Sequence, residues 1–163
     1  MTEKSAVIVV VEGYSDMASI GTILKEYFCS TETQFVITRG DITSRDGVTP
    51  ANVITKLKTE IDTVRTKYGY QWKDLIRIIH IADTDGTFTK DCVVKADVKS
   101  IQYYEDHMES ANVEVTQQRN ANKAEVMFKL SSTNKINSTD YRLYFNSCNL
   151  EHVLPVSYTH LTL

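Results

Sequence analysis

The chain has neither an excess of positive charge nor a long apolar segment. Its 163 residues hold 18 Lys and Arg against 21 Asp and Glu, a net charge of -3. Any contact with nucleic acid therefore has to come from a local patch and not from a generally basic surface. The apolar run at residues 6–11 is too short for the core of a signal peptide or for a membrane span. We expect no membrane contact and a cytoplasmic location.

Cysteine is also scarce, and its spacing excludes two further classes of protein. The three cysteines, Cys29, Cys92 and Cys148, lie far apart and form no C-x-x-C pair. This pattern indicates free thiols in a reducing compartment and not a disulfide framework. The sequence has no internal repeat, low-complexity tract or linker, so its length favours one domain, over residues 1–155.

The last eight residues, VSYTHLTL, resemble the translation of one reading frame of a transposase-type sequencing adapter. We therefore expect residues 156–163 to be an artefact that packs against nothing, with a frayed natural terminus as the alternative. On this interpretation the native chain continues beyond Pro155.

The remaining sequence alternates between strand-like and helix-like patterns. Strands are predicted at residues 6–11, 34–38, 75–82 and 141–147, with a weaker candidate at 100–104. Helices are predicted from a cap at Ser15 or Asp16, from Thr49-Pro50 through Tyr68, over 120–130, and over the short segment 149–154. This order predicts an α/β domain with a mainly parallel sheet flanked by helices.

Carboxylates follow two of the predicted strands. The segment IRIIHIADTDGTF is an apolar strand that ends in Asp83 and Asp85, and Glu12 follows the strand at residues 6–11. Carboxylates this close repel each other, so they either lie in solvent as a turn or are held together by a cation. Ligands of parallel α/β sheets bind where strands end. We expect the strands at 6–11 and 75–82 to be adjacent, with the three acids converging at the carboxyl edge.

The stretches VVVEGYSD and IADTDG, in this order, resemble the Toprim domain of topoisomerases, bacterial primases and OLD-type nucleases. Glu12-Gly13 and Asp83-Thr84-Asp85-Gly86 match its two acidic motifs, and VITRG at 36–40, with Arg39 and Gly40, resembles its second strand and glycine turn. The likeness covers residues 5–90 well. The later segment FNSCNLEHVL is only loosely similar to OLD-type relatives. The resemblance implies a Rossmann-like fold and Mg²⁺-dependent phosphodiester chemistry on nucleic acid, in the manner of a nuclease or nucleotidyltransferase.

The chemistry of these residue types agrees with that implication. Mg²⁺ or Mn²⁺ prefers oxygen ligands, and Asp83 and Asp85 could point the same way and share one ion. Glu12 could hold a second ion or accept a proton. Gly13 and Gly86 would let phosphate approach the backbone.

Other interpretations of the same residues stay open. The DTDG segment is compatible with a plain solvated turn, and Arg39 and Lys123 could contact phosphate but are more often solvated surface. The strand ending in D-x-D-G-T also resembles haloacid-dehalogenase-type phosphatases, in which Asp83 would be the nucleophile and Asp85 the acid/base, with Lys123 and Ser147 as possible partners. A non-catalytic binding module is the third possibility.

Two kinds of residue are expected to be structural. His80 lies inside a strand, which indicates a hydrogen-bonded core residue. We expect five aromatic side chains to pack and not to stack on bases: Tyr103, Tyr104, Tyr141, Tyr144 and Phe145.

Overall fold

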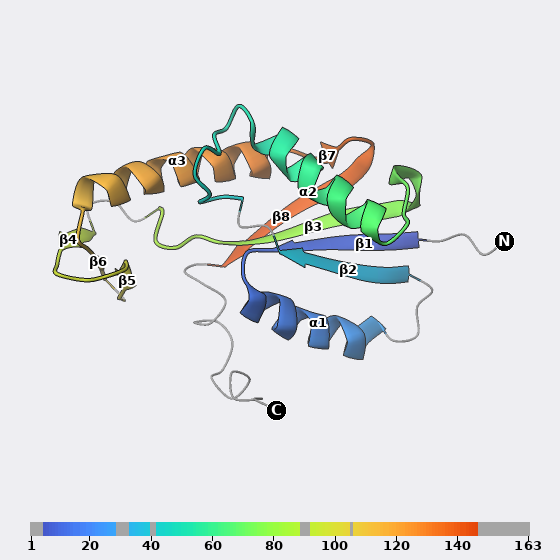
Figure 1. Cartoon of the computed structure of the whole chain (residues 1–163), viewed down its shortest axis with the longest axis horizontal. Coiled ribbons are helices and arrows are strands. Elements are labelled where there is room, and N and C mark those ends of the chain that lie inside the picture. The colour runs from blue at the N-terminus through green and yellow to red at the C-terminus, as the bar shows by residue number, and fades with distance from the viewer. Residues whose placement is uncertain (1–4, 29–32, 40–41, 89–91, 105, 147–163) are drawn as a thin grey trace.

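A computed structural model describes residues 5–28, 33–39, 42–88, 92–104 and 106–146 (Figure 1). Its first half contains β1 (Ser5–Val11), α1 (Tyr14–Phe28), β2 (Thr33–Arg39), α2 (Val53–Lys67), a 3-10 helix (Trp72–Asp74) and β3 (Leu75–Asp83). Its second half contains β4 (Val93–Lys95), β5 (Gln102–Tyr103), β6 (Met108–Ser110), α3 (Val113–Ser131), β7 (Lys135–Ile136) and β8 (Thr139–Asn146).

The main sheet has five strands in the order β2-β1-β3-β8-β7. The strands β2, β1, β3 and β8 run parallel, and only the short β7 is antiparallel to its neighbour β8. The predicted α/β class with a mainly parallel sheet and flanking helices is therefore confirmed. Because β1 and β3 are hydrogen-bonded neighbours, with Val11 opposite Ile81, the predicted adjacency of these two strands is confirmed as well.

Helices cover both faces of this sheet, which explains why β1 reads as an unbroken apolar run. α1 lies on one face, and α2 and α3 lie on the other (Figure 1). On the α1 side, Val7, Val9 and Val11 pack with Met17, Ile20 and Leu24 of the helix. The larger core on the other side combines residues of the sheet with residues of α2 and α3, including Ile8, Ile78, Tyr141, Leu57, Ile61, Val126 and Leu130.

A second, three-stranded sheet of order β4-β6-β5 lies at the N-terminal end of α3 (Figure 1). The sequence predicted one strand over 100–104, whereas the strand here is only Gln102–Tyr103. These strands have two or three residues each, too few for an alternating pattern to be visible in the sequence.

The predicted helix boundaries need three corrections. α1 begins at Tyr14, just before the predicted cap at Ser15 or Asp16. α2 begins at Val53 with Asn52 as its N-cap, after the predicted start at Thr49-Pro50, because the Val53 N–H donates to the Thr49 carbonyl at 3.0 Å in a turn that precedes the helix. α3 begins at Val113, well before the predicted residue 120, because the Asn112 side chain accepts from the Val115 N–H and caps it.

The predicted helix at 149–154 and the tail at 156–163 lie outside the described residues, as does Ser147. Among the described residues, no helix is long and apolar enough to cross a membrane.

Candidate functional site

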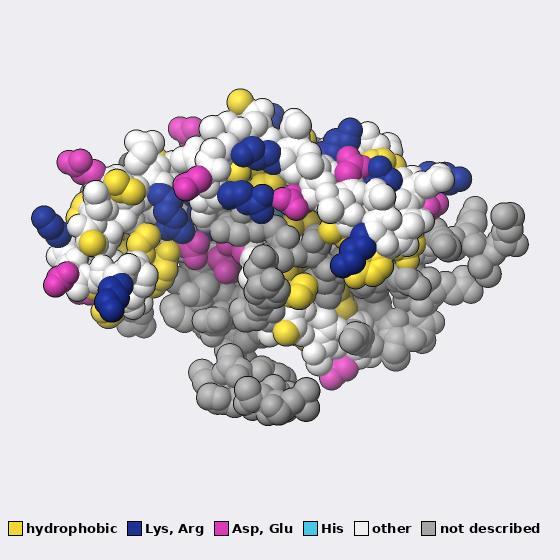
Figure 2. All heavy atoms as spheres, in the orientation of Figure 1, with side chains coloured by type: hydrophobic (Ala, Val, Ile, Leu, Met, Phe, Trp, Pro, Cys, Tyr) yellow, Lys and Arg dark blue, Asp and Glu magenta, His cyan; other side chains and the backbone are white. Residues whose placement is uncertain are grey.

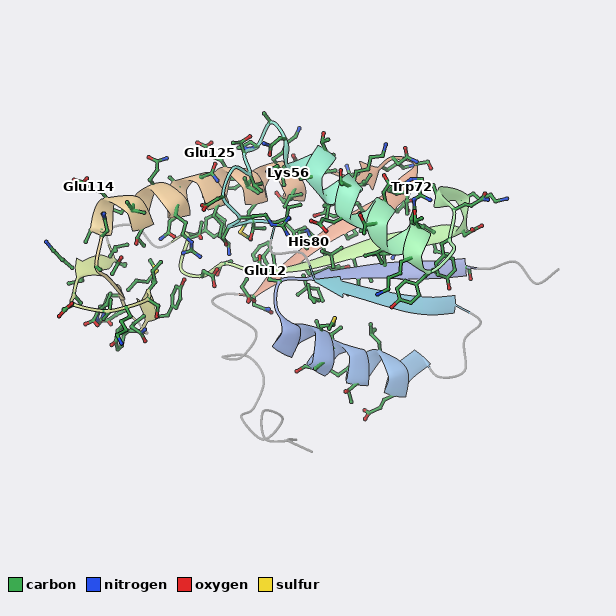
Figure 3. All side chains as sticks on the ribbon, viewed as in Figure 1. Glu12, Lys56, Trp72, His80, Glu114 and Glu125 are labelled. Atoms are coloured by element: carbon green, nitrogen blue, oxygen red, sulfur yellow. The ribbon has the colours of Figure 1, made fainter. Side chains whose placement is uncertain are left out.

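The carboxyl edge of the parallel sheet brings the predicted acids into one region. Glu12 directly follows β1, and Asp83 is the last residue of β3. Figure 3 shows Glu12 at the end of β1, close to the position of His80 on β3. The side of the sheet predicted for Glu12 and Asp83 is therefore confirmed.

A tight turn after β3 carries Asp85. The Thr87 N–H donates to the Thr84 carbonyl at 2.8 Å, and the two residues between them are both left-handed, with φ of 48° at Asp85 and 67° at Gly86. Glycine adopts this conformation without strain, and aspartate is one of the few other residues that tolerates it. The carboxylate of Asp85 contacts cations of α3, whereas the carboxylate of Asp83 accepts from Asn146 of β8.

Lys123 of α3 is the cation at the centre of this region. Its Nζ lies 2.6 Å from Oδ2 of Asp85 and 3.7 Å from Oε2 of Glu12, and its side chain is 0% exposed. Arg119, one helical turn earlier, places a guanidinium nitrogen 3.1 Å from the same oxygen of Asp85. The alternative that Lys123 is solvated surface is therefore wrong, and its predicted contact with phosphate stays a prediction. A fully buried ammonium needs charged partners, and Glu12 and Asp85 provide them.

Two neutral side chains each donate to one further carboxylate oxygen. The Thr43 hydroxyl donates to Oε1 of Glu12, and the Asn146 amide donates to Oδ1 of Asp83 at 3.1 Å. Asn146 ends β8, so its place opposite Asp83 follows from the strand register. Sequence reasoning missed both residues. The end of the predicted strand at 141–147 was a usable signal for Asn146, whereas Thr43 lies in a loop without any pattern.

His80 is buried directly behind this cluster, on β3. Its Nδ1 lies 2.9 Å from the Tyr141 hydroxyl, so the prediction of a hydrogen-bonded core histidine is confirmed. Burial, with a smaller contribution from the Lys123 charge, lowers the pKa of His80 to about 4. Burial also raises the pKa of Tyr141. Both side chains are therefore neutral at physiological pH. Among the described residues, Nε2 of His80 has no hydrogen-bond partner.

The other predicted site residues are placed as follows. Gly13 begins the first turn of α1, since its carbonyl accepts from the Met17 N–H at 3.3 Å. Gly86 completes the turn that carries Asp85. Arg39 ends β2 at the same sheet edge, but its side chain, like all of Gly40, lies outside the described residues.

The oxygen ligands present here are of the type that a hard divalent ion prefers. Their arrangement is centred on the ammonium of Lys123, and within the described residues no three His, Cys, Asp or Glu side chains gather closely enough to hold a metal ion. The residue types of this site are therefore those of a Mg²⁺ site, but Glu12 and Asp85 are paired with a lysine in this structure.

No family model, curated protein or solved structure matches this chain. The Toprim resemblance therefore stays a prediction that rests on the two acidic motifs and their order.

Proposed function

We propose that the protein carries out Mg²⁺- or Mn²⁺-dependent phosphoryl transfer on nucleic acid, as a nuclease or nucleotidyltransferase. The observation that supports this proposal is the meeting of two acidic motifs, from strands that are neighbours in space and distant in sequence, around one cationic group. Glu12 and Asp85 both face Lys123 Nζ at the carboxyl edge, and Asp83 ends the strand beside them. If the segment Asp83–Gly86 were only a solvated turn, the position of Glu12 beside it would have no explanation.

Glu12 and Asp83 are the proposed metal ligands, whereas Asp85, which the sequence also predicted as a ligand, is paired with Lys123 and Arg119. A divalent ion bound by such carboxylates polarises phosphoryl oxygens and lowers the pKa of bound water. The N-terminus of α1, directly after Gly13, adds positive potential where a phosphate would approach. Arg119 has 26% of its side chain exposed next to Asp85, so its guanidinium is accessible to a phosphate, whereas Lys123 is not.

Exposed aromatic side chains at the same edge support nucleic acid as the substrate class. Tyr144 and Phe145 lie in β8 directly before Asn146 and are 56% and 58% exposed. Tyr104 is 51% exposed, but it follows β5 and stacks on His107, away from that edge. Of the five aromatics expected to pack, Tyr141 is buried, but these three are not. Exposed rings next to a phosphate site can stack on bases, which favours single-stranded substrates.

The distribution of charge argues against a long duplex as substrate. On the face drawn in Figure 2, the described Lys and Arg side chains lie among Asp and Glu side chains and form no continuous basic track. A short or single-stranded substrate, held by the metal, Arg119 and stacking, needs no such track.

One observation keeps a phosphatase as the second candidate. The Asn146 amide donates to Oδ1 of Asp83 at 3.1 Å, which orients the carboxylate that would be the nucleophile. In that mechanism Asp83 would take the phosphoryl group while the alcohol leaves with a proton from Asp85, and water would then hydrolyse the aspartyl phosphate. Glu12 would have little part in the reaction.

Activity assays separate these functions. We expect the full chain, with Mg²⁺ or Mn²⁺, to cleave labelled single-stranded DNA or RNA, and Glu12→Gln and Asp83→Asn each to lower the rate by about 100-fold or more, since both would lose a metal ligand or proton acceptor. The matched control is Glu114→Gln, an exposed glutamate at the far end of α3 (Figure 3), which should retain the full rate.

Two outcomes would contradict the nuclease proposal. Cleavage that persists in Glu12→Gln would remove Glu12 from the site. Hydrolysis of a phosphomonoester such as p-nitrophenyl phosphate, lost in Asp83→Asn but retained in Glu12→Gln, would favour the phosphatase.

A further inference from the structure

We propose that Lys123 is a positioning residue that competes with the divalent ion. Its ammonium holds Glu12 and Asp85 while no metal is bound, and it releases Glu12 when a metal binds. This inference rests on the proposed function, because it assigns a regulator of metal affinity to the same site.

Lys123 lies on the buried face of α3. The buried stripe of this helix consists of Thr116, Asn120, Lys123, Val126, Met127 and Leu130. Lys123 therefore occupies a place where the periodicity of a helix calls for an apolar residue. An unpaired ammonium at such a position costs several kcal/mol, so a lysine here is tolerated only because acids of β1 and of the turn after β3 reach it.

The two contacts of the ammonium are unequal. Nζ is 2.6 Å from Asp85, within hydrogen-bond distance, but 3.7 Å from Glu12, which is an ion pair without a hydrogen bond. Arg119 holds the same oxygen of Asp85 from the exposed side. Asp85 is thus fixed by two cations, and Glu12 is the acid that a metal can draw away more easily. Glu12 and Asp83 are then the ligands available to the ion, while Asp85 stays with Lys123.

The net charge of the site determines whether removing the charge of Lys123 raises or lowers the affinity for a divalent cation. Among the described side chains of the site, with all groups ionised, the carboxylates of Glu12, Asp83 and Asp85 outnumber the cations Lys123 and Arg119 by one charge. Removing the charge of Lys123 doubles that negative excess and abolishes a repulsion that acts over a few ångströms in a buried place. The affinity for a divalent cation should therefore rise when Lys123 becomes neutral. A lysine that merely helped to build the site would have the opposite effect, because its loss would disorder the ligands.

The test compares the Mn²⁺ affinity of the wild type with that of Lys123→Met by calorimetric titration. The control is Lys129→Met, which removes an exposed lysine from the same helix. We expect Lys123→Met to bind Mn²⁺ at least about tenfold more tightly than the wild type and Lys129→Met to bind as the wild type does. Equal or weaker binding by Lys123→Met, with binding by the wild type intact, overturns the inference and leaves the proposed function standing. Absence of binding in all three proteins overturns both.

A second measurement uses the wild-type protein alone, and it tests whether the ion competes with Lys123 even if Lys123→Met does not fold. The buried ammonium of Lys123 should give a protected ¹H–¹⁵N signal in the wild-type protein. We expect this signal to shift in step with saturation by Mg²⁺, because the ammonium loses its contact with Glu12. A signal unchanged at saturating Mg²⁺ shows that the ion does not compete with Lys123, and it overturns the inference.

Discussion

Asp85→Asn should lower the free energy of unfolding of the metal-free protein by about 3 kcal/mol, because it leaves the fully buried ammonium of Lys123 without its closest counter-charge. The remaining acid, Glu12, lies 3.7 Å from Nζ and is too far away to replace the hydrogen bond at 2.6 Å. Urea denaturation in the presence of a chelator measures the change, since bound metal would otherwise contribute to stability.

The same substitution at an exposed ion pair is the control. Asp140 faces Lys135 at 4.0 Å with about half of its side chain exposed, so Asp140→Asn should change the stability by less than about 0.5 kcal/mol. Adding Lys123→Met to Asp85→Asn should restore part of the loss, because the buried charge is then gone. If Asp85→Asn lowers the free energy of unfolding by less than about 1 kcal/mol, the ion pair between Lys123 and Asp85 does not stabilise the fold as we propose.

Acidification from pH 7.5 to 5.0 should destabilise the wild type by about 2 kcal/mol more than it destabilises His80→Gln. The folded protein keeps His80 neutral, with a pKa of about 4, against 6.5 in the unfolded chain. Since the folded pKa is the lower one, the unfolded state binds the proton first. The stabilisation is complete above pH 6.5 and is lost as the pH falls from there towards 4. Measuring the free energy of unfolding at several pH values within this window gives its slope against pH.

Tyr141→Phe is the matched variant for this effect. It removes the hydroxyl that lies 2.9 Å from His80 Nδ1 but leaves the imidazole in place. Its stability should fall by about 1 kcal/mol at neutral pH, while the steep loss towards acid remains. If His80→Gln kept the wild-type slope, the acid sensitivity would have to come from other groups.

The sequence was sufficient to predict the parts of the fold that depend on local pattern. The β-branched run of β1 and the apolar run of β3 are buried on a sheet that is covered on both faces, so both strands were recognisable. Their parallel pairing follows from the helices between them, and it places Glu12 and Asp83 at one edge. The site acids could thus be proposed from residue order and strand ends alone.

The cations of the site could not be predicted in the same way. The helical spacing of Lys123 from Val126, Met127 and Leu130 indicates that this side chain is buried. Its partner Glu12, however, lies more than a hundred residues away in the sequence, and no local pattern identifies it. The direction of Asp85 depends on its left-handed φ of 48°, which a D-x-D-G motif permits but does not require. The short strands β4 and β6 were not predicted either, because three residues are too few to show an alternating pattern, whereas β5 falls inside the predicted strand at 100–104.

The most direct test of the central claim is the melting of the protein with and without Mg²⁺. If Glu12 and Asp83 bind the ion, a hundredfold excess over its dissociation constant should add about 2.7 kcal/mol to the wild-type stability. Glu12→Gln should lose most of this gain, and Glu114→Gln should keep all of it. A magnesium-dependent gain that survives Glu12→Gln unchanged, or no gain in the wild type, would contradict a metal site built on Glu12.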